Sequence, residues 1–213
     1  TLGASLRYLF LPTRAHVELP KLLMIGYIDI EVRDVHGNVM MRRTETLHSP
    51  VANWGKFLAY AIFVSPSLVG TNTERGTVVD LSGTEQPIGG GIDDGTYLWD
   101  YVEEPLWRIA FGNGSSPSFD RGVYALQNQL ALVTPSDTSI SITADNITIV
   151  FSASYSPSQD VNITELGLVL HFNKFDDLYT NYVDALMFYD VLETPVSVPA
   201  GGVITVTYRL VFP

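Results

Sequence analysis

The chain has 213 residues, of which 46% are hydrophobic and only 16% charged, a composition typical of a globular protein and not of a disordered one. Its formal net charge of −11 opposes binding to the phosphates of nucleic acid, and the absence of cysteine excludes disulfides, cysteine-ligated metals and thiol nucleophiles. No apolar run reaches the roughly 18 residues of a membrane helix, so we expect neither nucleic acid nor insertion into a membrane.

The first 25 residues carry a short apolar run, Leu9, Phe10 and Leu11, ahead of Pro12. Two roles are open for this segment. It is either an edge strand that folds back on its own sheet, or an arm that adds to the sheet of a neighbouring copy. The start of the chain lacks the basic flank and apolar core of a signal peptide.

Residues 24–32 alternate between apolar and polar side chains, with Ile28, Ile30 and Val32 in phase, and this period of two predicts a strand with one buried face. Turn residues at 34–38 and a second alternating stretch at 39–46 predict that the strand returns as a hairpin. The next segment has a helical period and follows the start signal Ser49-Pro50, so we expect one short helix over about residues 51–63.

Residues 64–95 are rich in Gly, Ser, Thr and Pro, and we expect a long loop excursion that serves as a contact surface. Further strands are predicted at 106–111, 147–155 and 166–172, the last with a bulge near Thr164-Glu165. The turn at 199–202 between apolar stretches predicts a closing hairpin over 196–212. Together these elements predict an all-β, jelly-roll-like antiparallel β-sandwich that forms a single domain over residues 26–213.

The sequence shows no constellation of catalytic residues, so we expect neither an enzyme nor a cofactor or metal site. The four histidines are scattered, and loops with acidic residues at 93–104 and 176–177 do not have the spacing of a calcium-binding loop. Three acceptor patterns for N-glycosylation begin at Asn113, Asn146 and Asn162. Aromatic residues that could stack on a sugar ring are Tyr97, Trp99, Tyr101 and Trp107.

Five segments occur in an order that resembles a family of virion structural proteins, associated with the tail or capsid, from tailed bacteriophages and other prokaryotic viruses. The segments are GYIDIEV (26–32) with DVHGN (34–38), HSPVANW (48–54), IAFGNGSSP (109–117) with Asp120 and AL (125–126), ITELGL (163–168), and ALMF (185–188) with VSVPAGGVITVTY (196–208). The chain differs from this family in Trp54, where Phe is commoner, and in the inserted residues 64–95.

The residues that carry this resemblance also have structural roles that can be argued physically. Gly112 and Gly114 let a strand turn sharply, and Glu165, if buried, needs donors such as the backbone N–H groups of that glycine turn. Asp120 is expected to cap the segment 121–130, and Leu126 to plug the end of the sandwich. The complete set of expected structural positions is Asn53, Trp54, Gly112, Gly114, Asp120, Leu126, Glu165, Gly167, Gly201 and Gly202.

The resemblance implies a structural, self-assembling subunit of a virus particle, without catalysis, whose partners are copies of itself and other virion proteins. The rival expectation is an extracellular filament or pilus subunit of a microbial cell, assembled by donor-strand exchange. A third alternative is a carbohydrate-binding module. The expected location is accordingly the virion or, for the rivals, the cell exterior.

Overall fold

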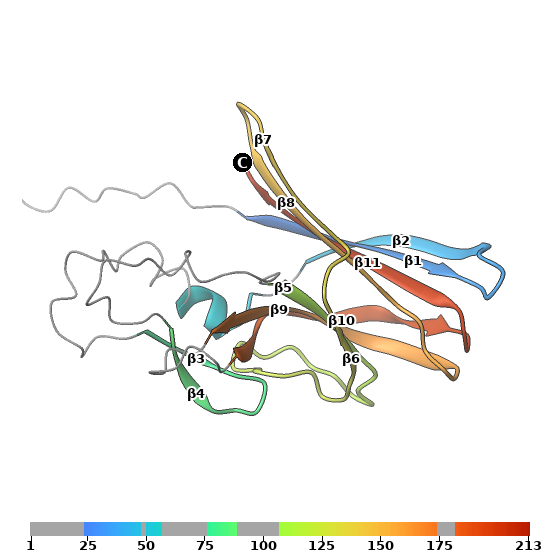
Figure 1. Cartoon of the computed structure of the whole chain (residues 1–213), viewed down its shortest axis with the longest axis horizontal. Coiled ribbons are helices and arrows are strands. Elements are labelled where there is room, and N and C mark those ends of the chain that lie inside the picture. The colour runs from blue at the N-terminus through green and yellow to red at the C-terminus, as the bar shows by residue number, and fades with distance from the viewer. Residues whose placement is uncertain (1–23, 48–49, 57–75, 89–106, 174–181) are drawn as a thin grey trace, which may run out of the picture.

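The structure is a computed structural model that describes residues 24–47, 50–56, 76–88, 107–173 and 182–213. Two antiparallel sheets pack face to face, and a separate two-stranded hairpin lies on the far side of one of them (Figure 1). A helical turn covers residues 52–56. The predicted all-β, jelly-roll-like sandwich with one short helix is therefore confirmed.

The first sheet has five strands in the order β2-β1-β11-β8-β7. The hairpin between its first two strands closes at Asp34, whose Oδ1 accepts the N–H groups of His36 and Asn38, and at Gly37, which has a φ of +84°. The predicted first hairpin is thus present. The bounds are β1 Ile25–Arg33, β2 Val39–Thr46, β7 Asp137–Ile142, β8 Ile147–Tyr155 and β11 Val203–Phe212.

The second sheet has four strands in the order β10-β9-β5-β6, and the chain crosses between the sheets after β6, β8 and β10. These repeated crossings, with β1 beside β11, give the fold its jelly-roll-like character. The bounds are β5 Trp107–Gly112, β6 Gln129–Val133, β9 Val161–Asn173 and β10 Tyr182–Val198.

The hydrophobic core lies between the two sheets. In β1 and β11 every second side chain is buried, because the other face of the five-stranded sheet meets solvent. Residues 165–170 of β9 and 185–190 of β10 are instead buried without interruption, because the four-stranded sheet is covered on both faces.

Part of the cover on the second face comes from a hairpin inside the expected loop excursion. Strands β3 (Gly76–Val79) and β4 (Glu85–Ile88) pair with each other, and the N–H of Leu81 donates to the backbone oxygen of Asp184 on β10. Asp80 and Gly83, with its φ of +84°, form the turn. The described part of the excursion is therefore a hairpin docked on the sheet. Its strands have only four residues each, which made the hairpin hard to predict from the sequence.

The closing hairpin predicted over 196–212 is wrong. Val196–Val198 belong to β10 in the four-stranded sheet, whereas β11 lies in the five-stranded sheet, so residues 199–202 form an arch between sheets. Gly201 has a φ of +69° and donates its N–H to the oxygen of Pro157 in the neighbouring arch. A Cβ on Gly202 would lie 2.8 Å from the oxygen of Arg33. Both glycines are needed, but for a crossing and not for a hairpin.

Two other predictions concern local irregularities. The register of β9 against β10 shifts between Ile163 and Glu165, as the change of parity predicted, and four residues of β10, 192–195, lie opposite the break. Of the helix predicted over 51–63, residues 52–56 are helical, and residues 57–63 lie outside the described residues.

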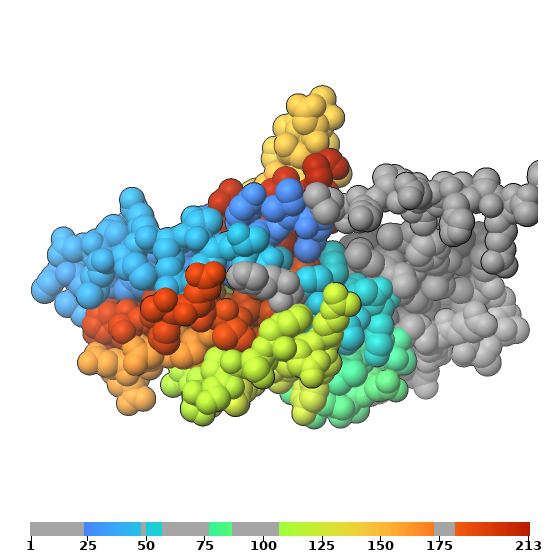
Figure 2. Space-filling model, turned by 180° about the vertical axis from the view of Figure 1, so that it is seen from behind, coloured from blue at the N-terminus to red at the C-terminus, as the bar shows by residue number. Residues whose placement is uncertain are grey.

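Figure 2 shows the β7–β8 hairpin, in yellow, standing out from the body of the molecule.

Candidate assembly surface

The carboxylate of Glu165 is fully buried between β5 and β10 and accepts four hydrogen bonds. Oε1 accepts the N–H groups of Gly114 at 3.0 Å and Asn128 at 2.9 Å. Oε2 accepts the N–H of Gln127 at 2.9 Å and the hydroxyl of Tyr189 at 2.8 Å. The donors include the glycine turn, as the sequence suggested. With every oxygen occupied by donors, this carboxylate anchors the segment 113–128 to the sheet.

The glycines around this carboxylate are required by space. A Cβ on Gly112 would lie 2.6 Å from Cγ of Glu165, and one on Gly114 would lie 2.9 Å from its Oε1. Burial of the Tyr189 phenol, followed in size by its hydrogen bond to Glu165, raises the pKa of Tyr189 well above its usual value. The hydroxyl therefore keeps its proton and stays a donor across the physiological pH range.

Leu126 packs on the outer face of the four-stranded sheet, against Val169 and Leu186, and not at the end of the sandwich. The prediction that Leu126 plugs the end of the sandwich is therefore wrong, because residues 113–128 run across the outer face of the sheet. Gly167 permits this approach, since a Cβ there would lie 2.7 Å from Cδ1 of Leu186 and 2.9 Å from Cδ1 of Leu126.

Asp120 stabilises a turn and does not cap a helix. Its Oδ1 accepts the N–H of Gly122 at 2.8 Å, and its backbone oxygen accepts the N–H of Val123 at 3.1 Å. The segment 121–130 that it was expected to cap consists of turns and the start of β6. An Asx turn and a helix cap use the same side-chain geometry, so the sequence alone did not separate them.

Asn53 and Trp54 fasten the helical turn to both sides of the four-stranded sheet. The buried Asn53 donates to the oxygens of Val79 and Leu186 and accepts the N–H of Val79. The ring of Trp54 packs 4.9 Å from that of Phe188 and 6.5 Å from that of Trp107. Both residues are therefore structural in this fold.

The three glycosylation acceptors differ in access. Asn162 is exposed on β9, Asn146 is half-buried in the turn between β7 and β8, and Asn113 is half-buried and accepts a hydrogen bond from Asn128 at 2.6 Å. Asn162 is the most exposed of the three, although its Oδ1 accepts the hydroxyl of Ser197 at 2.6 Å, and its modification remains a prediction. The apolar run at residues 9–11, the acidic loops at 93–104 and 176–177, and the aromatic residues at 97, 99 and 101 lie outside the described residues.

One polar cluster was not predicted. Nδ1 of His171 lies 2.9 Å from Oδ1 of Asp184, Arg108 bonds the same carboxylate at 3.2 Å, and Tyr182 stacks on the imidazole at 4.8 Å. In the sequence, Arg108, His171 and Asp184 each stand as a polar residue at an outward position of an otherwise apolar strand. Only the register of the three strands makes these side chains neighbours. Within the described ranges no group of three or more His, Asp or Glu side chains could hold a metal ion.

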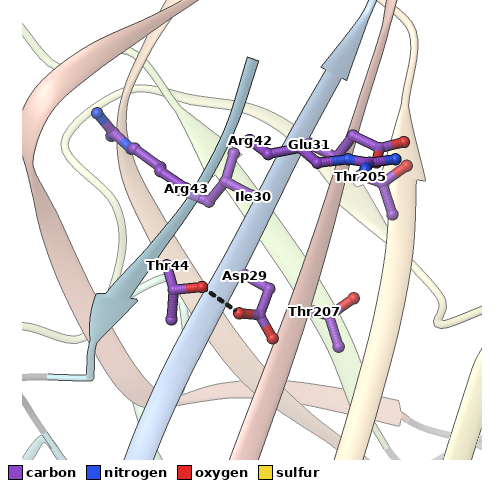
Figure 3. A pocket seen from close by; sticks show the side chains of 8 residues that line it. All are labelled: Asp29, Ile30, Glu31, Arg42, Arg43, Thr44, Thr205 and Thr207. Carbon is purple, nitrogen blue, oxygen red and sulfur yellow. Dashed lines mark hydrogen bonds and ion pairs between the residues drawn. The ribbon is translucent and has the colours of Figure 1, made fainter. Parts of the chain in front are cut away.

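A shallow hollow of about 460 Å³ lies on the exposed face of the five-stranded sheet (Figure 3). Its charges are paired: Asp29 accepts from Arg209 and from the hydroxyl of Thr44, and Glu31 accepts from Arg42. Partial burial raises the pKa of Asp29, but the hydrogen bonds outweigh this effect and the net pKa is lowered. Because each charge already has a partner, the hollow offers no unpaired charge to a ligand.

An apolar patch lies at the opposite edge of the same sheet. Ile140, Ile142 and Ile147 are 64%, 74% and 42% exposed, and we call them the isoleucine patch. Ile140 lies opposite Ile149 and Ile142 opposite Ile147, so all share the face that carries buried Phe151 further along β8. The patch is thus a part of the core-facing side of the sheet that the described second sheet leaves exposed.

The edge beside this patch is open in the part of the chain that the structure describes, where β7 pairs with β8 alone. At the other edge of the sheet, β2 carries Arg42, Arg43 and Glu45, the charges that usually keep an edge strand from pairing with another chain. β7 reads DTSISI and has a single charge at its start, Asp137. An exposed apolar edge of this kind is a template for strand addition.

Comparison with known protein families, with curated protein sequences and with solved structures found no match to this chain in any of the three. None of the described helical segments is long and apolar enough to span a membrane.

Proposed function

We propose that the chain is a structural subunit without catalytic activity that assembles with copies of itself into a virus particle, as a component of its capsid or tail. The observation that carries the proposal is the isoleucine patch beside the open edge of β7. Side chains exposed to this degree on the core-facing side of a sheet are costly in a lone molecule and become favourable once a partner buries them.

The packing of the rest of the sandwich supports the same role. The buried carboxylate of Glu165 and the amide of Asn53 are used to fasten loops to the four-stranded sheet. Trp107, a candidate for stacking on sugars, packs instead against Trp54 and Phe151. The resemblance of the five ordered segments to virion proteins is the reason for proposing that the assembly is a virus particle.

The test is assembly of the full chain, followed by sedimentation velocity and electron microscopy. The variant Ile140→Thr/Ile142→Thr keeps β-branched side chains but removes the apolar surface, and we expect it to remain folded and to fail to assemble. The matched control is Ser139→Thr/Ser141→Thr, which changes the opposite face of the same strand. A parent chain that stays monomeric at all concentrations and salt conditions would contradict the proposal.

The rival proposal, an extracellular filament joined by donor strands, uses the same open edge and gains support from the exposed acceptor Asn162. The two differ in the source of the native material. Glycan on Asn162 and unbranched filaments on the cell surface would favour the filament, whereas particles that also contain nucleic acid and other virion proteins would favour the virus. Mass spectrometry of the native subunit and micrographs of the same sample decide between them.

A further inference from the structure

The sequence at residues 1–23 differs in charge from the rest of the chain. It holds three basic residues, Arg7, Arg14 and Lys21, against one acidic residue, Glu18, and so carries a net charge of +2. Since the whole chain carries −11, the remaining residues carry −13. A basic segment on an acidic protein is suited to bind an acidic surface of that protein or of another copy.

The surroundings of β7 provide such a surface. No Lys or Arg occurs between residues 122 and 173, which include β7 and its partner β8. Asp137 begins β7 and Asp145 lies in the turn that follows it, and both are exposed. The open edge is therefore flanked by a carboxylate at each end, with the isoleucines between them.

The spacing of the two segments matches. Leu9 and Leu11 are two residues apart and share a face of an extended chain, as Ile140 and Ile142 do on β7. Arg7 and Arg14 are seven residues apart, about 23 Å at the rise of a strand, and the two aspartates at the ends of β7 are eight residues apart with a turn included. A parallel pairing of Leu9 with Ile140 and of Leu11 with Ile142 puts Arg14 at the position of Asp145 and Arg7 at that of Thr138, next to Asp137.

We propose that the run Leu9–Leu11 of one copy adds as a strand to the free edge of β7 in a second copy and covers the isoleucine patch. Arg7 and Arg14 of the incoming segment then lie at the two ends of β7, near Asp137 and Asp145 of the receiving copy. The inference rests on the proposed function and names the partner, the segment and the docking strand of that assembly.

The linker is long enough to bring the apolar run to an open β7 edge, and the trapping experiment below distinguishes the edge of a second copy from that of the same chain. Residues 12–23 separate the apolar run from Met24, where the described chain begins, and at about 3.3 Å per residue they reach up to about 40 Å. Three steps between strands, about 14 Å, separate β1 from β7 of the same sheet. Pro12 and Pro20 lack the N–H that a strand needs, so the linker is suited to bridge and not to pair.

The absence of cysteine allows a clean test by disulfide trapping. Leu11→Cys, made in one preparation with ¹⁵N label, is mixed with unlabelled Ile142→Cys, assembled and oxidised. Neighbouring strands place facing Cα atoms within the 4.4–6.8 Å that a disulfide needs. Ile140→Cys covers a shift of two residues in register. The matched control is Ser141→Cys, whose side chain lies on the opposite face of β7.

We expect a mixed-label disulfide dimer with Ile140→Cys or Ile142→Cys, at least ten times more abundant than with Ser141→Cys. Assembled material without this disulfide would overturn the docking site and leave the assembly itself standing. The double variant Leu11→Cys/Ile142→Cys tests the alternative. A disulfide within one of its chains, together with no mixed-label dimer from the single variants, would overturn the exchange and assign the patch to the segment of its own chain. A parent chain that does not assemble would overturn the proposed function.

Discussion

The hydroxyl of Tyr189 on β10 donates to Oε2 of Glu165 on β9 at 2.8 Å, and both side chains are buried in the four-stranded sheet. The same carboxylate holds three backbone N–H groups of the segment 113–128. One side chain thus replaces a missing strand as the partner of that segment, which explains how a loop of this length stays packed on the sheet.

Glu165→Gln is expected to lower the free energy of unfolding by about 3 kcal/mol. The amide has one acceptor oxygen and one donor nitrogen, so at least one of the four donors loses its acceptor and faces another donor. Urea unfolding followed by circular dichroism measures the loss. Glu193→Gln, at an exposed position of β10, is the control and should cost less than about 0.5 kcal/mol. Equal stability of the two variants would contradict the assigned role.

Gly112→Ala should destabilise the sandwich by about 1–3 kcal/mol, because the new Cβ would lie 2.6 Å from Cγ of Glu165 in a space with no room to move. Gly55→Ala is the matched glycine. It lies in the helical turn with nothing within 4 Å of its added Cβ, so we expect unchanged or slightly raised stability. Thermal unfolding of both variants distinguishes a steric requirement from a general effect of alanine.

Asn53→Ala should release the β3–β4 hairpin before the sandwich unfolds. The substitution leaves the N–H of Val79 and the oxygens of Val79 and Leu186 without this partner, at a cost of about 2–3 kcal/mol. Hydrogen exchange read by mass spectrometry should become faster in peptides covering 76–88 and stay unchanged in β11. Asn162→Ala, with an exposed amide, serves as the control, and protection of 76–88 that does not change would argue against the tie.

Acid should weaken the paired face of the five-stranded sheet. The pKa of Asp29 lies below its usual 3.8 in the folded chain, so as the pH falls through about 4 the unfolded state binds the proton first and this contribution to stability is lost. Asp29→Asn should therefore cost about 0.5 kcal/mol at pH 7 and less at pH 2.5, measured by urea unfolding at both values. A difference in the free energy of unfolding between the parent and Asp29→Asn that grows in acid would contradict this role of the ion pair.

Strands with one buried face were predictable from the sequence. β1, β8 and β11 alternate because one face meets solvent, and their positions follow directly from Ile28, Phe151 and Tyr208 in phase with their neighbours. β7 was missed, because its isoleucines are exposed and its short run of Ser and Thr resembles a loop. The proposed docking strand was therefore the least visible element of the sheet.

Relations between distant strands could not be predicted. A glycine turn such as 199–202 serves a hairpin and an arch equally well, since local φ values do not say which sheet receives the next strand. The cluster of Arg108, His171 and Asp184 depends on the register of three strands, which the sequence does not fix. The donors to Glu165 were predictable in kind, as backbone N–H groups, but Tyr189 was not.

The position of β11 between β1 and β8 determines when the larger sheet can close. The β1–β2 and β7–β8 hairpins are each local in the chain, yet no strand joins them into one sheet until β11, which follows both, has been synthesised. On the ribosome, the two half-sheets therefore remain unjoined until the end of the chain emerges, and the larger sheet is completed by a late insertion between them. Such non-local closure is slow, so a nascent chain of this kind depends on protection from premature contact with its sister chains.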